Sequence, residues 1–537
     1  MAITQNSVFL QFLLSLWTGL CTAVRESSLY RFLRRGGTLD GWAQGSAVCG
    51  FFRRAGAVLA GWARGSALCR CLCREGVLMR AWPDSLTCRA LSALVNLPGT
   101  LLRLARPAAE GSALCRAVRW SRTGGLLGRL CAAPAFCLGL TVLAFLVVPH
   151  DKWNNLYGFL GAAAVLAFFY AGAAVRPRRR LELDRTGPYL VLYGAMVCLG
   201  LVLSRDVSLS MRFFIFHVTA LLLALLTVSM VRRFEQLRLL AALAVLGITV
   251  ASLYGCWQVY AGTAVVGAHP NLTLNDGEIQ RVFSFFDNPN NFAELLVMLV
   301  PLDFALIGTA RTRGGRFCAV IALVPCLISL AFTYSRSSFI ALLLAVVIFF
   351  ALQDRRVIPL FLVLALLAFP LLPRSIYERV LSIGDKEDTS VNYRFAIYEA
   401  VGEFLKDHWK RGVGLGSDVL QKVLKAEYEP MYDGNYPIHA HNGYLQVWCE
   451  MGILGLLSFL GLLGGQLKGA LRAFRRGTDP RVKLMLSGAA AGFCGILVIS
   501  VAEYTWFYPR NMFIYFFLFG IIGACVKLAG ANAPREG

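Results

Sequence analysis

The chain has 537 residues, of which 57% are hydrophobic and 16% charged, and its formal net charge is +22. A soluble protein of this length would bury its apolar residues in a few compact cores and show more charge. Many stretches run for about twenty residues with almost no charge, the length that about 30 Å of hydrocarbon requires. The composition therefore excludes an ordinary cytosolic enzyme, a disordered protein and a nucleic-acid-binding domain, and it predicts an all-α polytopic membrane protein.

The first predicted element is an N-terminal arm, residues 1–133, which is rich in Arg, Cys and Trp and carries more than half of the net positive charge. Its short apolar segments, interrupted by arginines, are typical of amphipathic helices that lie on the membrane surface with guanidinium groups on lipid phosphates. A small cytosolic domain or a partly disordered arm fits the same composition. Cys69, Cys71 and Cys73 lack a fourth ligand at zinc-type spacing, so we expect no metal.

Residues 134–537 are predicted to form a transmembrane domain of about twelve helices. The expected spans are 134–149, 153–175, 188–204, 211–231, 239–260, 291–309, 317–334, 337–352, 357–373, 444–466, 484–503 and 511–529. Lys and Arg concentrate in alternate loops, whereas the short loops between them hold one each. The positive-inside rule therefore places both termini in the cytoplasm and the long, polar segment 374–443 outside, where we expect a folded helical loop.

Three ionisable residues fall within or beside spans near the predicted outer surface: Glu294, Arg336 and Glu450. Charges within a membrane are costly, so each is a candidate functional residue. Each alone is also explained as a structural polar group with a satisfied partner. Their collection on one side favours an outward-facing polar site.

The segment from Arg281 runs into the sixth predicted span and contains Asn288 and Asn290, which are turn and cap formers. Capping of that span would by itself account for these residues. In the outer loop, residues 392–406 are predicted to form an amphipathic helix, whose apolar face comprises Phe395, Tyr398, Val401 and Leu405. Arg394 lies near the start of this helix, where a cation is disfavoured unless an anion compensates it.

Residues Gly412 to Gly416 then predict a flexible turn, which lacks the strand and lysine of a P-loop. The run His439-Ala-His441-Asn442 leads into the tenth span, which contains Glu450. His441 at this helix start would titrate near neutrality and act as a base. Two solvated histidines beside a helix cap would give the same pattern.

Taken in order, these motifs resemble the O-antigen ligase / O-antigen polymerase superfamily over roughly residues 275–525. The motifs are Arg281 with Asp287 to Asn290, Tyr334-Ser335-Arg336, Arg394 with Gly412 to Gly416, and His439 to Asn442 followed by Glu450 and Gly455. The resemblance implies a polytopic glycosyltransferase that uses polyprenyl-diphosphate-linked glycans on the outer side of the bacterial cytoplasmic (inner) membrane. Ser337 stands where family members often have Gly, and the arm has no counterpart in the family.

The resemblance implies His441, Arg394 and Arg336 as catalytic residues. The remaining residues that it implies would bind substrate: Arg281, Asn288, Asn290, Glu294, His439, Asn442 and Glu450. The two arginines would neutralise the departing diphosphate, and His441 would deprotonate the acceptor hydroxyl. No metal and no cofactor is implied. The expected partners are a polyprenyl-diphosphate-linked glycan donor, a glycan or glycolipid acceptor and membrane lipids, but no nucleic acid.

The leading hypothesis is a ligase, and a repeat-unit polymerase with the same donor chemistry is the close alternative. A lipid-linked oligosaccharide flippase is the more distant one, because transporters commonly place their polar groups near the middle of the membrane. The arm could additionally recruit partners.

Overall fold

The computed structural model describes residues 76–110, 122–175, 179–263, 265–266, 280–355, 357–368, 389–430 and 434–531, with isolated positions at 26, 54, 58 and 61. Packing divides the chain into two compact units, residues 1–80 with 311–318 and residues 81–310 with 319–537. The contacts reported below lie within the second unit. Most of the predicted arm before residue 76 lies outside the described residues.

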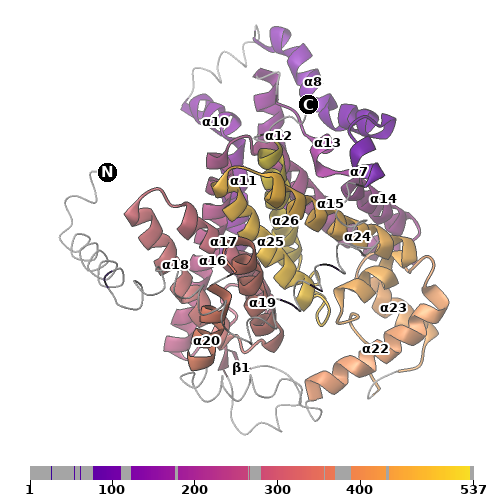
Figure 1. Cartoon of the computed structure of the whole chain (residues 1–537). Coiled ribbons are helices and arrows are strands. Elements are labelled where there is room, and N and C mark those ends of the chain that lie inside the picture. The colour runs from indigo at the N-terminus through magenta and orange to yellow at the C-terminus, as the bar shows by residue number, and fades with distance from the viewer. Residues whose placement is uncertain are drawn as a thin grey trace. The chain divides into compact units, whose positions relative to one another are not determined.

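Regular structure in the described part is almost entirely helical (Figure 1). The elements in chain order are α7 (Val77–Ala81), α8 (Leu86–Glu110), α10 (Arg122–Ala132), α11 (Pro134–Val147), η1 (His150–Lys152), α12 (Leu156–Val175), α13 (Leu183–Thr186), α14 (Pro188–Val202), α15 (Val207–Met230), α16 (Phe234–Ala261), β1 (Val265–Val266), β2 (Gln280–Arg281), α17 (Pro289–Thr309), α18 (Arg313–Phe332), α19 (Arg336–Gln353), α20 (Val357–Ala368), α22 (Thr389–His408), α23 (Ser417–Glu427), α24 (Gly443–Arg476), α25 (Pro480–Ile499) and α26 (Pro509–Ala531). The strands β1 and β2 pair antiparallel, with Val265 opposite Arg281.

Nine helices of the described part are long and apolar enough to cross a membrane, namely α12, α15, α16, α17, α18, α19, α24, α25 and α26. Helices α11 and α14 are apolar but shorter, and α20 is described over 12 residues. The predicted all-helical polytopic architecture is confirmed at this level. The count of twelve spans stays a prediction.

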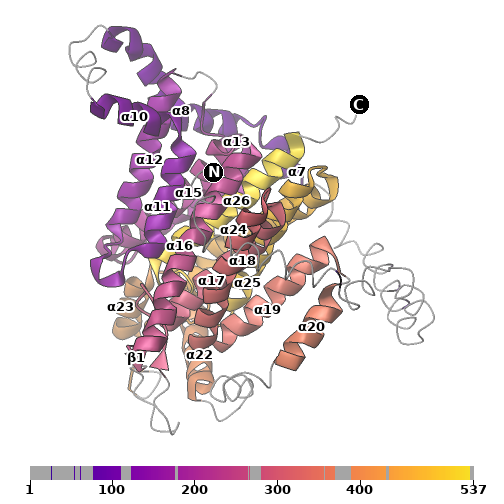
Figure 2. The ribbon, with the colours of Figure 1, turned by 90° about the vertical axis from the view of Figure 1, so that its left-hand side faces the viewer.

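Glycines let α25 approach α17 closely in the bundle (Figure 2). A Cβ on Gly492 would lie 2.2 Å from the Met298 carbonyl oxygen, and one on Gly488 would lie 2.5 Å from that of Pro301. Small residues at such contacts are typical of helices in membranes, where van der Waals packing and hydrogen bonds drive association. The helices α17, α25 and α26 are correspondingly among the most buried spans.

The predicted outer segment has a hydrophobic core of its own, formed by α22, α23 and the start of α24. The predicted helix over 392–406 is present within α22, but its predicted apolar face is partly wrong. Val401 and Leu405 are buried as predicted, but Phe395 is 60% exposed, whereas Ile397 and Phe404 are buried. The rotation of α22 that packs Ile397 and Phe404 into this core turns Phe395 outward.

The glycine-rich loop Gly412–Gly416 packs its backbone against a kink in α24. Gly414 N donates to the Glu450 carbonyl oxygen at 3.0 Å. Gly452, at the kink, has a φ of +67°, and a Cβ there would lie 2.2 Å from the Lys410 carbonyl oxygen. At Gly452 a side chain is disfavoured both by the positive φ and by the clash with this carbonyl oxygen. Gly452 is therefore explained by close backbone packing.

Candidate active site

Arg394 and His441, two of the predicted catalytic residues, meet at one carboxylate, that of Glu503. Arg394 Nη2 donates to Glu503 Oε1, and His441 Nδ1 lies 3.3 Å from Glu503 Oε2. The Arg394 and His441 side chains are 24% and 23% exposed, and that of Glu503 is 11% exposed. Three segments far apart in the sequence, namely α22, the start of α24 and the turn after α25, thus form one half-buried polar cluster.

The Glu503 carboxyl is held in its ionised form. Burial raises its pKa, but the hydrogen bond from His441 and the charges of Arg394 and His441 lower it more, so the pKa lies below the ordinary value of 4.5. An ionised carboxylate accepts hydrogen bonds from both donors at once. The cluster therefore places a negative charge between a guanidinium and an imidazole at neutral pH.

His439 supports the backbone of His441. His441 has a φ of +45°, in the left-handed region that non-glycine residues rarely adopt, and its N–H donates to His439 Nδ1 at 3.2 Å. The two ring centroids lie 4.2 Å apart. Burial, with a smaller contribution from His441, lowers the pKa of His439 to about 3. His439 is therefore a neutral acceptor at physiological pH.

Asn442 caps α24 and attaches the histidine motif to the turn after α25. Its Oδ1 accepts from two backbone N–H groups in the first turn of α24, at 2.9 and 3.0 Å. Its Nδ2 donates to the Val501 carbonyl oxygen at 2.8 Å, and Gly443 N donates to that of Ser500 at 2.7 Å. The position of His441 relative to Glu503 is thus fixed by the backbone as well as by the side chains.

Glu450 joins α24 to the same turn. It is 2% exposed, and its Oε1 accepts from Gln446 Nε2 at 2.8 Å and from the Tyr504 hydroxyl at 3.2 Å. A buried carboxyl needs such donors. Tyr504 follows Glu503 directly, so Glu450 holds the residue next to the shared carboxylate.

Arg281 and Asn290 form a second cluster. Arg281 Nε donates to the Thr333 carbonyl oxygen at 2.8 Å, and its Nη2 donates to Asn290 Oδ1 at 2.8 Å. The Asn288 side chain caps α17 by accepting from Asn290 N at 2.7 Å. Because Thr333 lies three residues before Arg336, this cluster holds the turn that leads into α19.

Glu294 and the start of α26 lie beside this second cluster. Asn511 Nδ2 donates to Glu294 Oε2 at 2.6 Å and to the Asn291 carbonyl oxygen at 3.1 Å. The neighbouring Arg510 is fully buried and donates to the Phe285 carbonyl oxygen at 3.0 Å and to carbonyl oxygens at the end of α11. These contacts attach α26 to α17 and to the loop that carries Arg281.

Arg336, the first residue of α19, lies at the same end of the bundle. Helices α19 and α25 run antiparallel, because Gln353 Nε2 donates to Ser487 Oγ at 2.7 Å and a Cβ on Gly495 would lie 3.3 Å from the Ala341 carbonyl oxygen. Arg336 precedes Ala341 by five residues, so it lies level with the end of α25. The turn that carries Glu503 begins there.

Sequence reasoning missed the segment that connects the two clusters, residues 500–511. The apolar run extends the predicted span to Glu503, whereas α25 ends at Ile499. Within this segment Glu503 and Tyr504 contact the histidine cluster, while Arg510 and Asn511 contact the Arg281 side. An acid and an arginine on either side of an aromatic run at the end of a span would have marked it as functional.

Within the described ranges, no group of three or more His, Cys, Asp and Glu side chains could hold a metal ion. The metal-free chemistry expected from the sequence stays a prediction. So do the roles of the individual site residues.

The fold and this polar site define a class: a polytopic helical membrane protein with a half-buried cluster of charged side chains at one end of the bundle. Comparison with protein families is consistent with that description. Residues 321–460 match the model of the O-antigen ligase family, which confirms the resemblance to the O-antigen ligase superfamily. The matched stretch contains Arg336, Arg394 and His441, but it ends before Glu503. No curated protein matches the chain. The match and the apolar helices together indicate a membrane enzyme of the glycosyltransferase type.

Proposed function

We propose that the protein transfers a glycan from a polyprenyl-diphosphate carrier to an acceptor on the outer side of the bacterial cytoplasmic membrane, as an O-antigen ligase-type glycosyltransferase. One observation carries this proposal: Arg394 and His441 share the Glu503 carboxylate. A cation for a departing phosphate and a base for an attacking hydroxyl thereby lie within one cluster.

Arg394 is the proposed contact for the diphosphate. Its Nη2 is engaged by Glu503, but its Nε has no hydrogen-bond partner among the described residues although it is buried. A buried donor without an acceptor is costly, and a phosphate oxygen would satisfy it. Four helices, α17, α19, α24 and α26, also begin at this end of the bundle and direct the positive ends of their dipoles toward it.

His441 is the proposed general base. Its Nδ1 faces Glu503, which leaves Nε2 as the nitrogen directed to substrate. Nε2 takes the proton of the acceptor hydroxyl while that oxygen attacks the anomeric carbon. The bond between this carbon and the diphosphate oxygen breaks, and the lipid diphosphate leaves with its negative charge opposite Arg394 and Arg336.

Glu503 has a positioning role in this proposal. It fixes the tautomer and the orientation of His441 and holds Arg394 beside it. Buried carboxylates that accept a hydrogen bond from a catalytic histidine do the same in other enzymes.

Four of the other predicted substrate-binding residues support the site instead of contacting substrate. Asn288 and Asn442 cap helices, and Glu294 and Glu450 are buried acceptors of protein donors. Arg281, Asn290 and His439 remain proposed contacts for the sugar or the phosphate.

The test uses purified protein in liposomes with a labelled polyprenyl-diphosphate glycan and a lipid-linked acceptor. His441→Ala and Arg394→Ala should each abolish formation of the new glycosidic bond, while Lys425→Ala, at an exposed position of α23, should leave it unchanged. Full turnover by both site variants would contradict the site assignment. Movement of labelled lipid across the bilayer without a new bond would instead identify a flippase.

The acceptor decides between ligase and polymerase. A ligase adds one glycan to each acceptor, whereas a polymerase lengthens its product by repeat units with time. Sizing the labelled product at several time points distinguishes the two, and we expect a single addition.

A further inference from the structure

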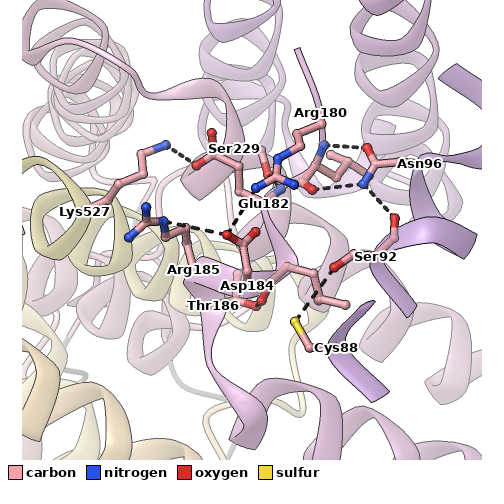
Figure 3. A network of polar contacts seen from close by, with 12 residues as sticks. Cys88, Ser92, Asn96, Arg180, Glu182, Asp184, Arg185, Thr186, Ser229 and Lys527 are labelled. Atoms are coloured by element: carbon pink, nitrogen blue, oxygen red, sulfur yellow. Dashed lines mark hydrogen bonds and ion pairs between the residues drawn. The ribbon is translucent and has the colours of Figure 1, made fainter. Parts of the chain in front are cut away.

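Helix α8 is attached to the bundle by polar contacts (Figure 3). Asn96 Oδ1 accepts from Leu181 N at 2.7 Å, and Asn96 Nδ2 donates to the Leu181 carbonyl oxygen at 3.0 Å. Trp82 Nε1, just before α8, donates to the Leu183 carbonyl oxygen at 3.2 Å. The Tyr170 hydroxyl, in the last turns of α12, donates to a carbonyl of α8.

The segment that receives α8 is itself held by two spans. Glu182 N donates to Ser229 Oγ of α15 at 2.9 Å, and Lys527 Nζ of α26 lies 2.8 Å from Glu182 Oε2 (Figure 3). Lys527 follows the start of α26 by 18 residues, about 27 Å along the helix. The α8 attachment therefore lies at the end of the bundle opposite to the start of α26 and the Glu503 cluster. Figure 2 shows α8 at the other end of the ribbon from α22 and α23.

Away from these contacts, α8 exposes a row of leucines. At 100° per residue they fall within a sector of about 80° on the helix surface. The members and their exposed fractions are Leu86 83%, Leu94 63%, Leu97 46%, Leu101 54% and Leu104 73%. Asn96 faces the protein whereas the leucine row faces outward, and such an exposed apolar row needs an apolar surrounding.

We propose that α8 is an in-plane membrane helix, whose leucine row is inserted among lipid chains at the surface of the bilayer. The helix is long enough to span but is not among the nine apolar candidates, so it fits the surface rather than the interior. Arg89, Arg103 and Arg106 lie outside the leucine row, and Glu110 is the one acid in the α8 sequence. The excess of arginines matches anionic lipid headgroups.

The neighbourhood of α8 favours lipid over a protein partner. Gly99 of α8 packs on Tyr170 and Ala173 in the last turns of α12. Only 33% of the apolar stretch of α12 is buried, so most of that helix faces the hydrocarbon. Through the face opposite its leucine row, helix α8 thus packs on a span that is largely exposed to lipid, and the row itself points away from the protein. The basic segment before α13 places this end on the cytoplasmic side by the positive-inside rule.

Photo-crosslinking of the full chain tests this placement. Benzoylphenylalanine is introduced singly at Leu97 and Leu101, in the leucine row, and at Lys425, an exposed position of α23, as the control in aqueous surroundings. The proteins are reconstituted in phosphatidylethanolamine–phosphatidylglycerol vesicles and irradiated, and adducts are identified by intact mass. We expect lipid adducts at Leu97 and Leu101 with several-fold higher yield than at Lys425.

Two outcomes would overturn the proposal. Crosslinks from Leu97 or Leu101 to a second copy of the chain would show that the leucine row is a protein interface. A lipid yield as low as at Lys425 would show that the row does not enter the bilayer. All three positions are exposed, so we expect the variants to fold, and size-exclusion chromatography verifies this. The test does not depend on transferase activity.

Discussion

Replacing Glu503 by glutamine tests whether the shared carboxylate holds Arg394 and His441 in place. The amide offers one acceptor oxygen, whereas both partners are donors, so one contact is lost together with the negative charge. A charge-assisted hydrogen bond contributes about 1.5–3 kcal/mol. The partners' side chains are 24% and 23% exposed, which favours the lower part of this range. We expect the stabilisation of the transition state to fall by about 2 kcal/mol, which lowers kcat about 30-fold.

The assay is the initial rate of glycan transfer in liposomes over a range of donor concentrations, expressed per folded protein. A positioning residue affects the transition state more than substrate binding, so kcat should fall while KM for the donor changes little. Glu503→Asp keeps the charge but is one methylene shorter. We expect its rate to lie between those of wild type and Glu503→Gln.

Glu399→Gln is the matched control, because it makes the same chemical change at an exposed position of α22, five residues after Arg394. Its rate should equal that of wild type. If Glu503→Gln also transferred at the wild-type rate, or if only its donor KM rose, the reasoning about the shared carboxylate would be refuted.

Three further predictions concern stability, measured as Tm in detergent. Wild-type stability should rise with pH between about 3 and 6.5, because in this range His439 is protonated in the unfolded chain but not in the folded protein. His439→Asn keeps an acceptor for His441 N, and its stability should not show this rise. The pKa of Glu503 is lowered on folding, so its ionised carboxylate stabilises the fold above pH 4.5, and this stabilisation is lost as the pH falls through the pKa of the folded state. The stability of Glu503→Gln should lack this pH-dependent loss. Gly452→Ala should lower Tm strongly, since strain at positive φ alone costs about 1–3 kcal/mol, whereas Gly464→Ala in the same helix, where a Cβ meets open space, should raise Tm slightly.

The sequence predicts well the features that depend on local pattern. The apolar runs predict the spans, and the amphipathic pattern predicts the helix that carries Arg394. The motif at His441 marks the start of α24. Each of these follows from residues that are contiguous in the sequence and lie within one helix or at its start.

Features that depend on tertiary packing could not be predicted from the local sequence pattern. The apolar face of α22 depends on how it packs against α23, so the sequence pattern alone predicts the wrong side for Phe395. Glu503 continues an apolar run, and only the packing of α22 and α24 on the turn after α25 makes it a common acceptor. Gly414 and Gly452 look like flexible positions until their backbones are seen in contact with opposing segments.

The late position of the turn after α25 has a consequence for biogenesis. Arg394 and His441 are synthesised before Glu503, and the turn that carries Glu503 is bonded to the start of α24 through Asn442 and Gly443. A nascent chain that ends before this turn therefore carries the Arg394 guanidinium and the His441 imidazole without their common carboxylate. Assembly of the polar cluster thus waits until the turn after α25 has been synthesised, and a chain stalled before this turn would lack the cluster.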